Sequence, residues 1–82
     1  MEMNNNTNLL SRIAIYPNYA YGKPCLKRHG VWVSSILADL ADGRNIKDIL
    51  EKYPCLEQED ILACFAYAAE MTQDITEVVG KI

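Results

Sequence analysis

The chain has 82 residues and a formal net charge of −3, and half of its residues are hydrophobic. This length excludes a two-domain enzyme, and the composition excludes the polar, highly charged mixture that keeps chains disordered. A single core of this size supplies only about 3 to 5 kcal/mol, so small domains commonly add disulfides, a metal or a partner surface.

The N-terminal third of the chain predicts a tail followed by short strands. Residues 1–8 are polar and rich in asparagine, so we expect a disordered tail. Residues 9–33 are expected to form a β-arm, with strands over 12–16 and 25–28 and a third extended stretch at 31–33. The segment 19–24 between the strands reads as a turn or loop.

Two short helices are predicted next, and 34–82 is expected to be the helical part of the domain. The first helix covers 34–42, with Ser34 or Ser35 as its N-cap and Gly43 as its stop. The second covers 46–52, because Asn45 is a good N-cap and Pro54 prevents continuation.

A third helix is predicted from near 57–59 to Glu70. The carboxylates at its start suit the positive end of a helix dipole. Its expected apolar stripe consists of Ile61, Leu62, Phe65, Ala68 and Ala69. Residues 72–76 weaken the helical pattern before Val78 and Val79, which predicts a kink or a short fourth helix.

The order of these helices is typical of a helix-turn-helix unit. A short amphipathic helix, a connection at 53–56 and a longer helix follow one another, and helix 34–42 completes a three-helix core. We therefore predict a mainly α fold with a homeodomain-like or winged-helix-like core and short N-terminal β-strands. Other small helical proteins also join helices by short loops, so the spacing alone does not establish DNA binding.

An ordered series of short motifs runs through most of the chain. The motifs are Tyr21-Gly-Lys-Pro-Cys-Leu-Lys27, Ile46-x-x-Ile-Leu-Glu51, Tyr53-Pro-x-Leu56 and Phe65-Ala-Tyr-Ala-Ala-Glu70. This series resembles the domain of unknown function family 433. The resemblance implies a small prokaryotic antitoxin-type protein, a helix-turn-helix core, a β-arm that supports dimerisation and pairing with a PIN-like toxin.

The chain departs from the family pattern at one place. Where the family usually carries Gly-Thr-Arg, this chain has Arg28-His29-Gly30, and Trp32 replaces the usual proline. Any role that the resemblance assigns to the family's arginine does not transfer directly. Lys27 and Arg28 keep positive charge nearby.

Charge is distributed unevenly and suggests where an anionic partner would bind. Residues 1–45 carry a net charge of +2 and residues 46–82 a net charge of −5. The expected phosphate contacts are Lys23, Lys27, Arg28 and Arg44, and the expected base-reading residue is Gln58. The carboxylates of Glu57, Glu59 and Asp60 oppose DNA binding by the third helix, because phosphates repel them.

The three cysteines do not predict a metal site, a disulfide framework or catalysis. Cys25 and His29 are four residues apart and Cys55 and Cys64 nine apart, which is not the spacing of a zinc finger or ribbon. We expect core thiols, no metal, no cofactor and no enzymatic activity.

Aromatic and basic residues are interleaved in the β-arm. Tyr16, Tyr19, Tyr21 and Trp32 lie close in sequence to Lys23, Lys27 and Arg28. Such a group either stacks on nucleic acid or forms the centre of a protein interface. Core filling is the alternative, and we favour it for Trp32.

Two hypotheses follow from these patterns together with what the family resemblance implies. The first is a homodimeric, antitoxin-like protein that binds operator DNA and pairs with a PIN-like toxin. The second is a protein-interaction module whose helix-turn-helix-shaped core does not bind DNA. In both cases we expect a cytoplasmic protein without membrane contact, because no secretory leader or apolar span is evident.

Overall fold

The computed structural model describes residues 8–73, which form a mainly helical fold. The elements in chain order are β1 (Ile13–Ala14), the 3-10 helix η1 (Ala20–Gly22), β2 (Cys25–Leu26), α2 (Val33–Ala41), α3 (Ile46–Lys52) and α4 (Gln58–Met71). Residues 8–10 are also helical. The predicted fold class, mainly α with short N-terminal strands, is confirmed. The predicted tail, except Asn8, and most of the predicted kink at 72–79 lie outside the described residues.

The β-arm is shorter in its strands than predicted. β1 and β2 pair antiparallel, with Ile13 opposite Leu26 and Ala14 opposite Cys25. The predicted third stretch contributes only an isolated bridge between Trp32 and Cys25. The strand prediction for 12–16 was too long, since pairing ends at Ala14 and Ile15 is 56% exposed.

Helix α2 begins one residue earlier than predicted and without a serine cap. Trp32 is the N-cap, no side chain caps the helix, and Val33 is already helical. The N–H of Val33 donates to the carbonyl of Pro24 at 3.0 Å, and the Val33 side chain is buried. The tertiary contact with the loop therefore replaces the predicted cap at Ser34 or Ser35.

Helix α3 has the boundaries and the N-cap that the sequence predicts. The Asn45 side chain accepts the N–H of Asp48 at 2.8 Å, and the Asp48 carboxylate accepts the N–H of Asn45 at 3.2 Å. This reciprocal capping box satisfies two otherwise unpaired donors. Ile49 is fully buried and anchors the helix in the core.

Helix α4 begins where predicted but buries a different face. Its N-cap is Glu57, and the buried apolar residues are Ile61, Ala63 and Cys64. Phe65 is 44% exposed and Ala69 is exposed, so the predicted stripe was wrong at these two positions. The sequence offers an apolar residue on almost every side of α4, and only packing against α2 and β1 selects the buried side.

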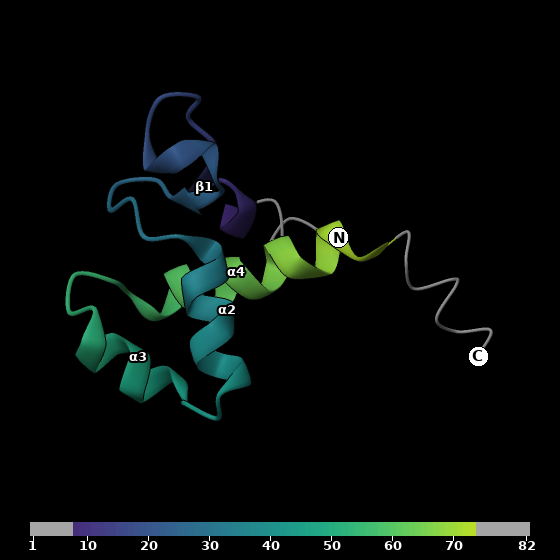
Figure 1. Cartoon of the computed structure of the whole chain (residues 1–82). Helices are drawn as coiled ribbons and strands as arrows, with labels where there is room; N and C mark the ends of the chain where they lie inside the picture. The colour runs from purple at the N-terminus through teal and green to yellow at the C-terminus, as the bar shows by residue number, and fades with distance from the viewer. Residues whose placement is uncertain (1–7, 74–82) are drawn as a thin grey trace.

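The core lies where α2, α3, α4 and the β-arm meet. Figure 1 shows that α2 crosses α4. It also shows α3 at the opposite end of the molecule from the loop that follows β1. The buried cluster consists of Leu26, Val33, Ile36, Ile49, Leu56, Ile61 and Cys64. Each buried aliphatic side chain stabilises the fold by about 1.5 to 3 kcal/mol. Because this core contains few such side chains, the free energy of unfolding depends strongly on each of them. Within residues 8–73, no helix has the length and apolarity needed to cross a bilayer.

Candidate functional site

A cleft of about 870 Å³ lies between the β-arm and the start of α4. One wall comes from the arm and from the turn that follows β2, and it carries the basic side chains Arg12, Lys27, Arg28 and His29. The opposite wall comes from the α3–α4 connection and the first turn of α4, and it carries Cys55, Glu57, Glu59 and Asp60. The cleft therefore separates a basic wall from an acidic one.

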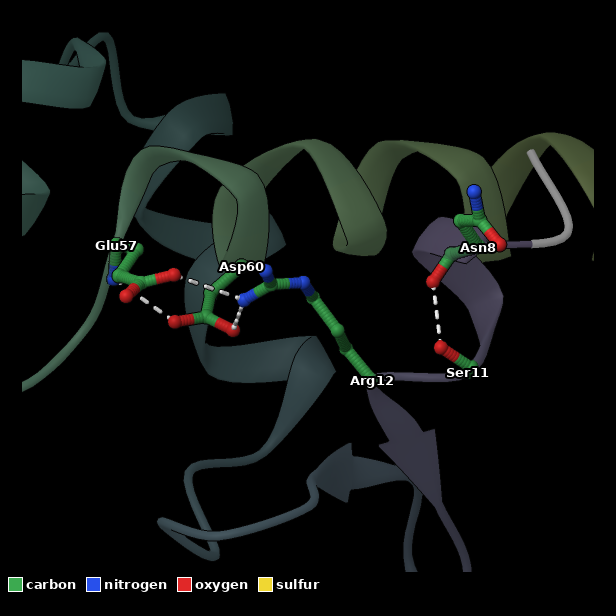
Figure 2. A network of polar contacts seen from close by, with 5 residues as sticks. All are labelled: Asn8, Ser11, Arg12, Glu57 and Asp60. Carbon is green, nitrogen blue, oxygen red and sulfur yellow. Dashed lines mark hydrogen bonds and ion pairs between the residues drawn. The ribbon is translucent and has the colours of Figure 1, made fainter. Parts of the chain in front are cut away.

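Arg12 bridges the two walls, as Figure 2 shows. Its Nη1 donates to Asp60 Oδ1 at 3.0 Å and to Glu57 Oε1 at 3.2 Å. The hydrogen bond to Asp60 is the main cause that raises the pKa of Arg12 above its ordinary value. The guanidinium thus stays charged and fixes the arm to α4.

Asp60 is the most deeply buried of the acidic residues at the start of α4. Its side chain is 7% exposed, compared with 67% for Glu57. Besides the contact with Arg12, its Oδ2 accepts the backbone N–H of Glu57 at 2.8 Å. Its charge is therefore compensated by a cation, a backbone donor and the positive end of the helix dipole.

The acidic cluster is consequently less open to a ligand than its sequence suggests. Glu57 and Asp60 both pair with Arg12, and Glu59 is an exposed carboxylate for which no ion pair is found among the described residues. Arg12 offsets one of the three negative charges, which lowers the electrostatic cost of bringing a phosphate to this end of α4.

Three of the five predicted DNA contacts lie at this end of the molecule. Lys27 and Arg28 are exposed in the turn after β2 and line the cleft. Gln58 is the first residue of α4 and is exposed between Glu57 and Glu59, but it does not line the cleft. No local sequence pattern indicates that the turn and the helix start face one another, because they are thirty residues apart and meet only through tertiary packing.

The other two predicted contacts are held elsewhere. The Lys23 ammonium lies 4.3 Å from the centre of the Trp32 ring, within the β-arm. Arg44 follows α2, and its Nε is 3.7 Å from Asp39 Oδ1. Asp39 is buried on α2, and its Oδ2 also forms an ion pair with Lys52 Nζ at 3.1 Å. The structure does not bring Lys23 and Arg44 to the cleft.

Two cleft residues were missed as site candidates. Arg12 is the only charged residue in the polar-to-apolar segment 8–16, and its isolation among β-formers is the signal that could have indicated a tertiary ion pair. His29 is the second, because the sequence pattern relates it only to Cys25, at a spacing that does not fit a zinc site. It lines the cleft, whereas Cys25 is fully buried in the core.

The cysteines differ in their surroundings. Cys25 and Cys64 are buried and Cys55 is exposed, so the expectation of core thiols was wrong for Cys55. Burial, and secondarily the Asp60 carboxylate, raises the pKa of Cys64 from 9.0 to about 12. Across residues 8–73, no three histidine, cysteine or acidic side chains are grouped so that they could hold a metal ion.

Comparison with known proteins identifies one family that this chain matches. Searches of curated proteins and of solved structures give no significant match. A family model described as protein of unknown function (DUF433) matches residues 13–68, from β1 into α4. The match extends over more than half of the chain and includes the cleft residues from Lys27 to Leu62. The cleft residues 8–12, which include Arg12, precede it. The chain therefore belongs to the DUF433 family.

Proposed function

We propose that this chain is an antitoxin-like regulatory protein that binds operator DNA as a cytoplasmic homodimer and pairs with a PIN-like toxin. The family resemblance suggests this class, and the order of α2, α3 and α4 agrees with a helix-turn-helix protein. In this proposal α4 is the recognition helix, which enters the major groove by its N-terminal end.

The observation that supports the proposal best is the position of the turn after β2. Lys27 and Arg28 share one cleft with the first turn of α4. A recognition helix needs cations beside its N-terminal end, because phosphate contacts orient the protein on the duplex. In this proposal Lys27 and Arg28 contact phosphates and Gln58 reads a base edge, most readily an adenine. Lys23 and Arg44 would contribute more distant phosphate contacts.

A mobility-shift assay with DNA from the chain's own upstream region tests the DNA-binding part. We expect a shift at low salt, and we expect Lys27→Glu with Arg28→Glu to weaken it. The slope of log affinity against log salt concentration should fall by about one for each lost phosphate contact. The thermal midpoint should stay nearly unchanged, because both side chains are exposed.

Lys47→Glu is the matched control, since Lys47 is also exposed but lies on α3, outside the cleft. It should shift DNA like the unchanged protein. A scrambled duplex of equal length separates sequence-specific from general binding. If the unchanged protein shifts no DNA even at low salt, the DNA-binding part of the proposal is wrong.

A second candidate function is a protein-interaction module that does not bind DNA. Residues 46–73 carry two basic and six acidic side chains, a net charge of −4, and α4 belongs to this acidic half. Such a surface repels phosphates and favours a basic protein partner. Co-purification with the product of the neighbouring reading frame, combined with the absence of a mobility shift, would favour this function over DNA binding.

A further inference from the structure

Exposed apolar side chains gather in one loop of the β-arm. Among the described residues, six large apolar side chains are exposed, and four of them belong to residues 15–21. These four, Ile15, Tyr16, Tyr19 and Tyr21, are called the tyrosine patch below. Tyr21 is the extreme case, with 89% of its surface exposed. Exposed apolar side chains that gather in one segment are a candidate interaction surface.

The loop that carries the patch is held in an unusual backbone conformation. Ala20, Tyr21 and Gly22 have φ values of 55°, 59° and 69°, so three successive residues are left-handed. Residues other than glycine avoid this region, because their Cβ atom crowds the following carbonyl oxygen. Strained backbone of this kind persists only where surrounding contacts hold it, and it is concentrated at functional sites.

Trp32 supplies the contacts that hold this loop. Its Nε1 donates to the carbonyl of Ala20 at 3.1 Å, and the N–H of Lys23 donates to the same carbonyl at 3.1 Å. The Tyr21 ring meets the Trp32 ring edge-on, with 5.8 Å between centroids. The patch is therefore ordered before any partner binds, which lowers the entropic cost of binding.

Tyr19 is fixed in a second way. Its ring lies edge-on to the Tyr16 ring at 5.7 Å. It also lies so close to the backbone of Gly30 that a Cβ atom at that position would collide with it. A shallow hollow of about 470 Å³ is formed by Tyr16, Pro17, Asn18, Tyr19 and Lys27. This hollow offers apolar ring surface beside one ammonium group.

The charge of the arm that carries the patch has a single sign. Residues 9–32 contain four basic side chains and no aspartate or glutamate. Arg12 is paired with α4, whereas Lys23 and Lys27 form no ion pair within the part of the chain that is described. An occupant of the patch therefore has to bring carboxylates or other anionic groups with its apolar surface.

We propose that the tyrosine patch docks an acidic, aliphatic segment of a partner protein. An aliphatic side chain of that segment packs in the hollow against Tyr16 and Tyr19, and a neighbouring carboxylate pairs with Lys27. A protein segment fits better than single-stranded nucleic acid, because Ile15 offers no ring on which a base can stack and Lys23 covers one face of Trp32. The inference rests on the proposed pairing with a protein partner and adds its surface.

The experiment uses the full chain and a short fluorescein-labelled peptide of repeated Leu-Glu-Ser. The patch variant is Tyr16→Ser with Tyr19→Ser, since both rings line the hollow and both side chains are exposed to water. The control variant is Phe65→Gln with Met71→Gln, which removes exposed apolar groups from α4. Both variants leave Lys27 and Arg28 intact, so DNA binding can be measured on the same proteins.

We expect fluorescence anisotropy to show binding of the Leu-Glu-Ser peptide that weakens roughly tenfold or more in the patch variant and not in the control. A Leu-Lys-Ser peptide and a peptide of Ser and Glu alone should bind more weakly than Leu-Glu-Ser. Equal binding by the patch variant, or no binding by the unchanged chain, would overturn the proposal. Stronger, patch-dependent binding of single-stranded oligonucleotide would also overturn it in favour of a nucleic-acid site.

Two further measurements separate this inference from the proposed function. If the product of the neighbouring reading frame binds the patch variant as well as the unchanged chain, the proposed docking on the tyrosine patch is wrong, whereas the proposed pairing with that product is retained. If that product does not bind at all but the Leu-Glu-Ser peptide does, pairing with it is wrong while the patch stands. A chain that dimerises only when the patch is intact would show that a second copy is the occupant, which contradicts the proposal.

Discussion

Arg12 is the residue through which the β-arm and α4 act on one another. Its contact with Glu57 contributes little to stability, because both side chains are substantially exposed to water. Its contact with Asp60 matters more, since that carboxylate is nearly buried and would otherwise lose part of its compensation. One arginine thus stabilises the N-terminal end of α4 and orders the cleft.

Replacing Arg12 by glutamine is expected to lower the free energy of unfolding by about 1 kcal/mol, because a charge-assisted hydrogen bond to a buried carboxylate is lost. In a domain of this size, this corresponds to a decrease of roughly 4 to 8 °C in thermal midpoint, which circular dichroism can measure. Lys47→Gln is the control, since it removes an exposed charge from α3. Equal midpoints for the two variants would contradict the role given to Arg12.

Helix α3 depends on its ends and its neighbours, because seven residues are too few for an independent helix. The capping box of Asn45 and Asp48 supplies local stabilisation, and Ile49 supplies the packing. The Lys52 ammonium then joins the end of α3 to Asp39 on α2. A short helix with this many attachments behaves as part of the core.

Asn45→Ala should destabilise the protein by about 1 kcal/mol, because the N–H of Asp48 loses its acceptor. Asn45→Ser keeps a capping oxygen and should retain most of the stability. Chemical denaturation of the two variants makes this comparison. If serine and alanine are equally destabilising, the side-chain cap is not the cause.

The cysteines allow the packing of α4 to be tested by thiol reactivity. Cys55 is exposed, whereas Cys25 and Cys64 are fully buried. A thiol reagent at neutral pH should therefore react rapidly with one cysteine of the native chain and with all three after denaturation. Cys55→Ser should abolish the rapid reaction. Rapid modification of a second thiol would show that the core around α4 opens readily.

Cys64 also predicts a loss of stability at high pH. Its pKa is raised from 9.0 to about 12 in the folded chain. Below pH 9 the thiol is protonated in both states and costs nothing, whereas above it the unfolded chain releases the proton first and is favoured. Stability should fall from about pH 9 towards pH 12, and Cys64→Ala should reduce this slope. An unchanged slope would assign the alkaline loss to other groups.

At the scale of the whole molecule, the exposed apolar groups of the arm are separated in space from α3. The basic arm with its tyrosine patch lies at one end, and α3 lies at the other (Figure 1). The helical core is small, and large side chains such as Tyr21 and Phe65 stay exposed to water. Burial against another protein is the remaining way to remove this surface from water.

We therefore expect the purified chain to be a homodimer at micromolar concentration, as measured by light scattering coupled to size exclusion. Dimerisation adds buried apolar area that a domain of this length lacks. The Phe65→Gln with Met71→Gln variant shows whether the exposed side of α4 takes part. A stable monomer at micromolar concentration would contradict this prediction.

The local sequence determined the elements whose signals lie within a few neighbouring residues. Asn45 and Pro54 define α3, and the acidic residues at 57–59 mark the start of α4, because caps and helix breakers act over a single turn. The mainly helical fold followed from these signals. The same local evidence placed Lys27, Arg28 and Gln58 on a list of candidate contacts but did not group them.

Only the tertiary structure decided the features that depend on residues distant in sequence. Packing against β1 and α2 exposed Phe65 and buried Cys64, although both are apolar residues of one helix. The carbonyl of Pro24 took the place of a serine cap on α2. Arg12 turned an acidic helix start into a paired one, since an ion pair needs two side chains within 4 Å and sequence patterns do not measure that distance.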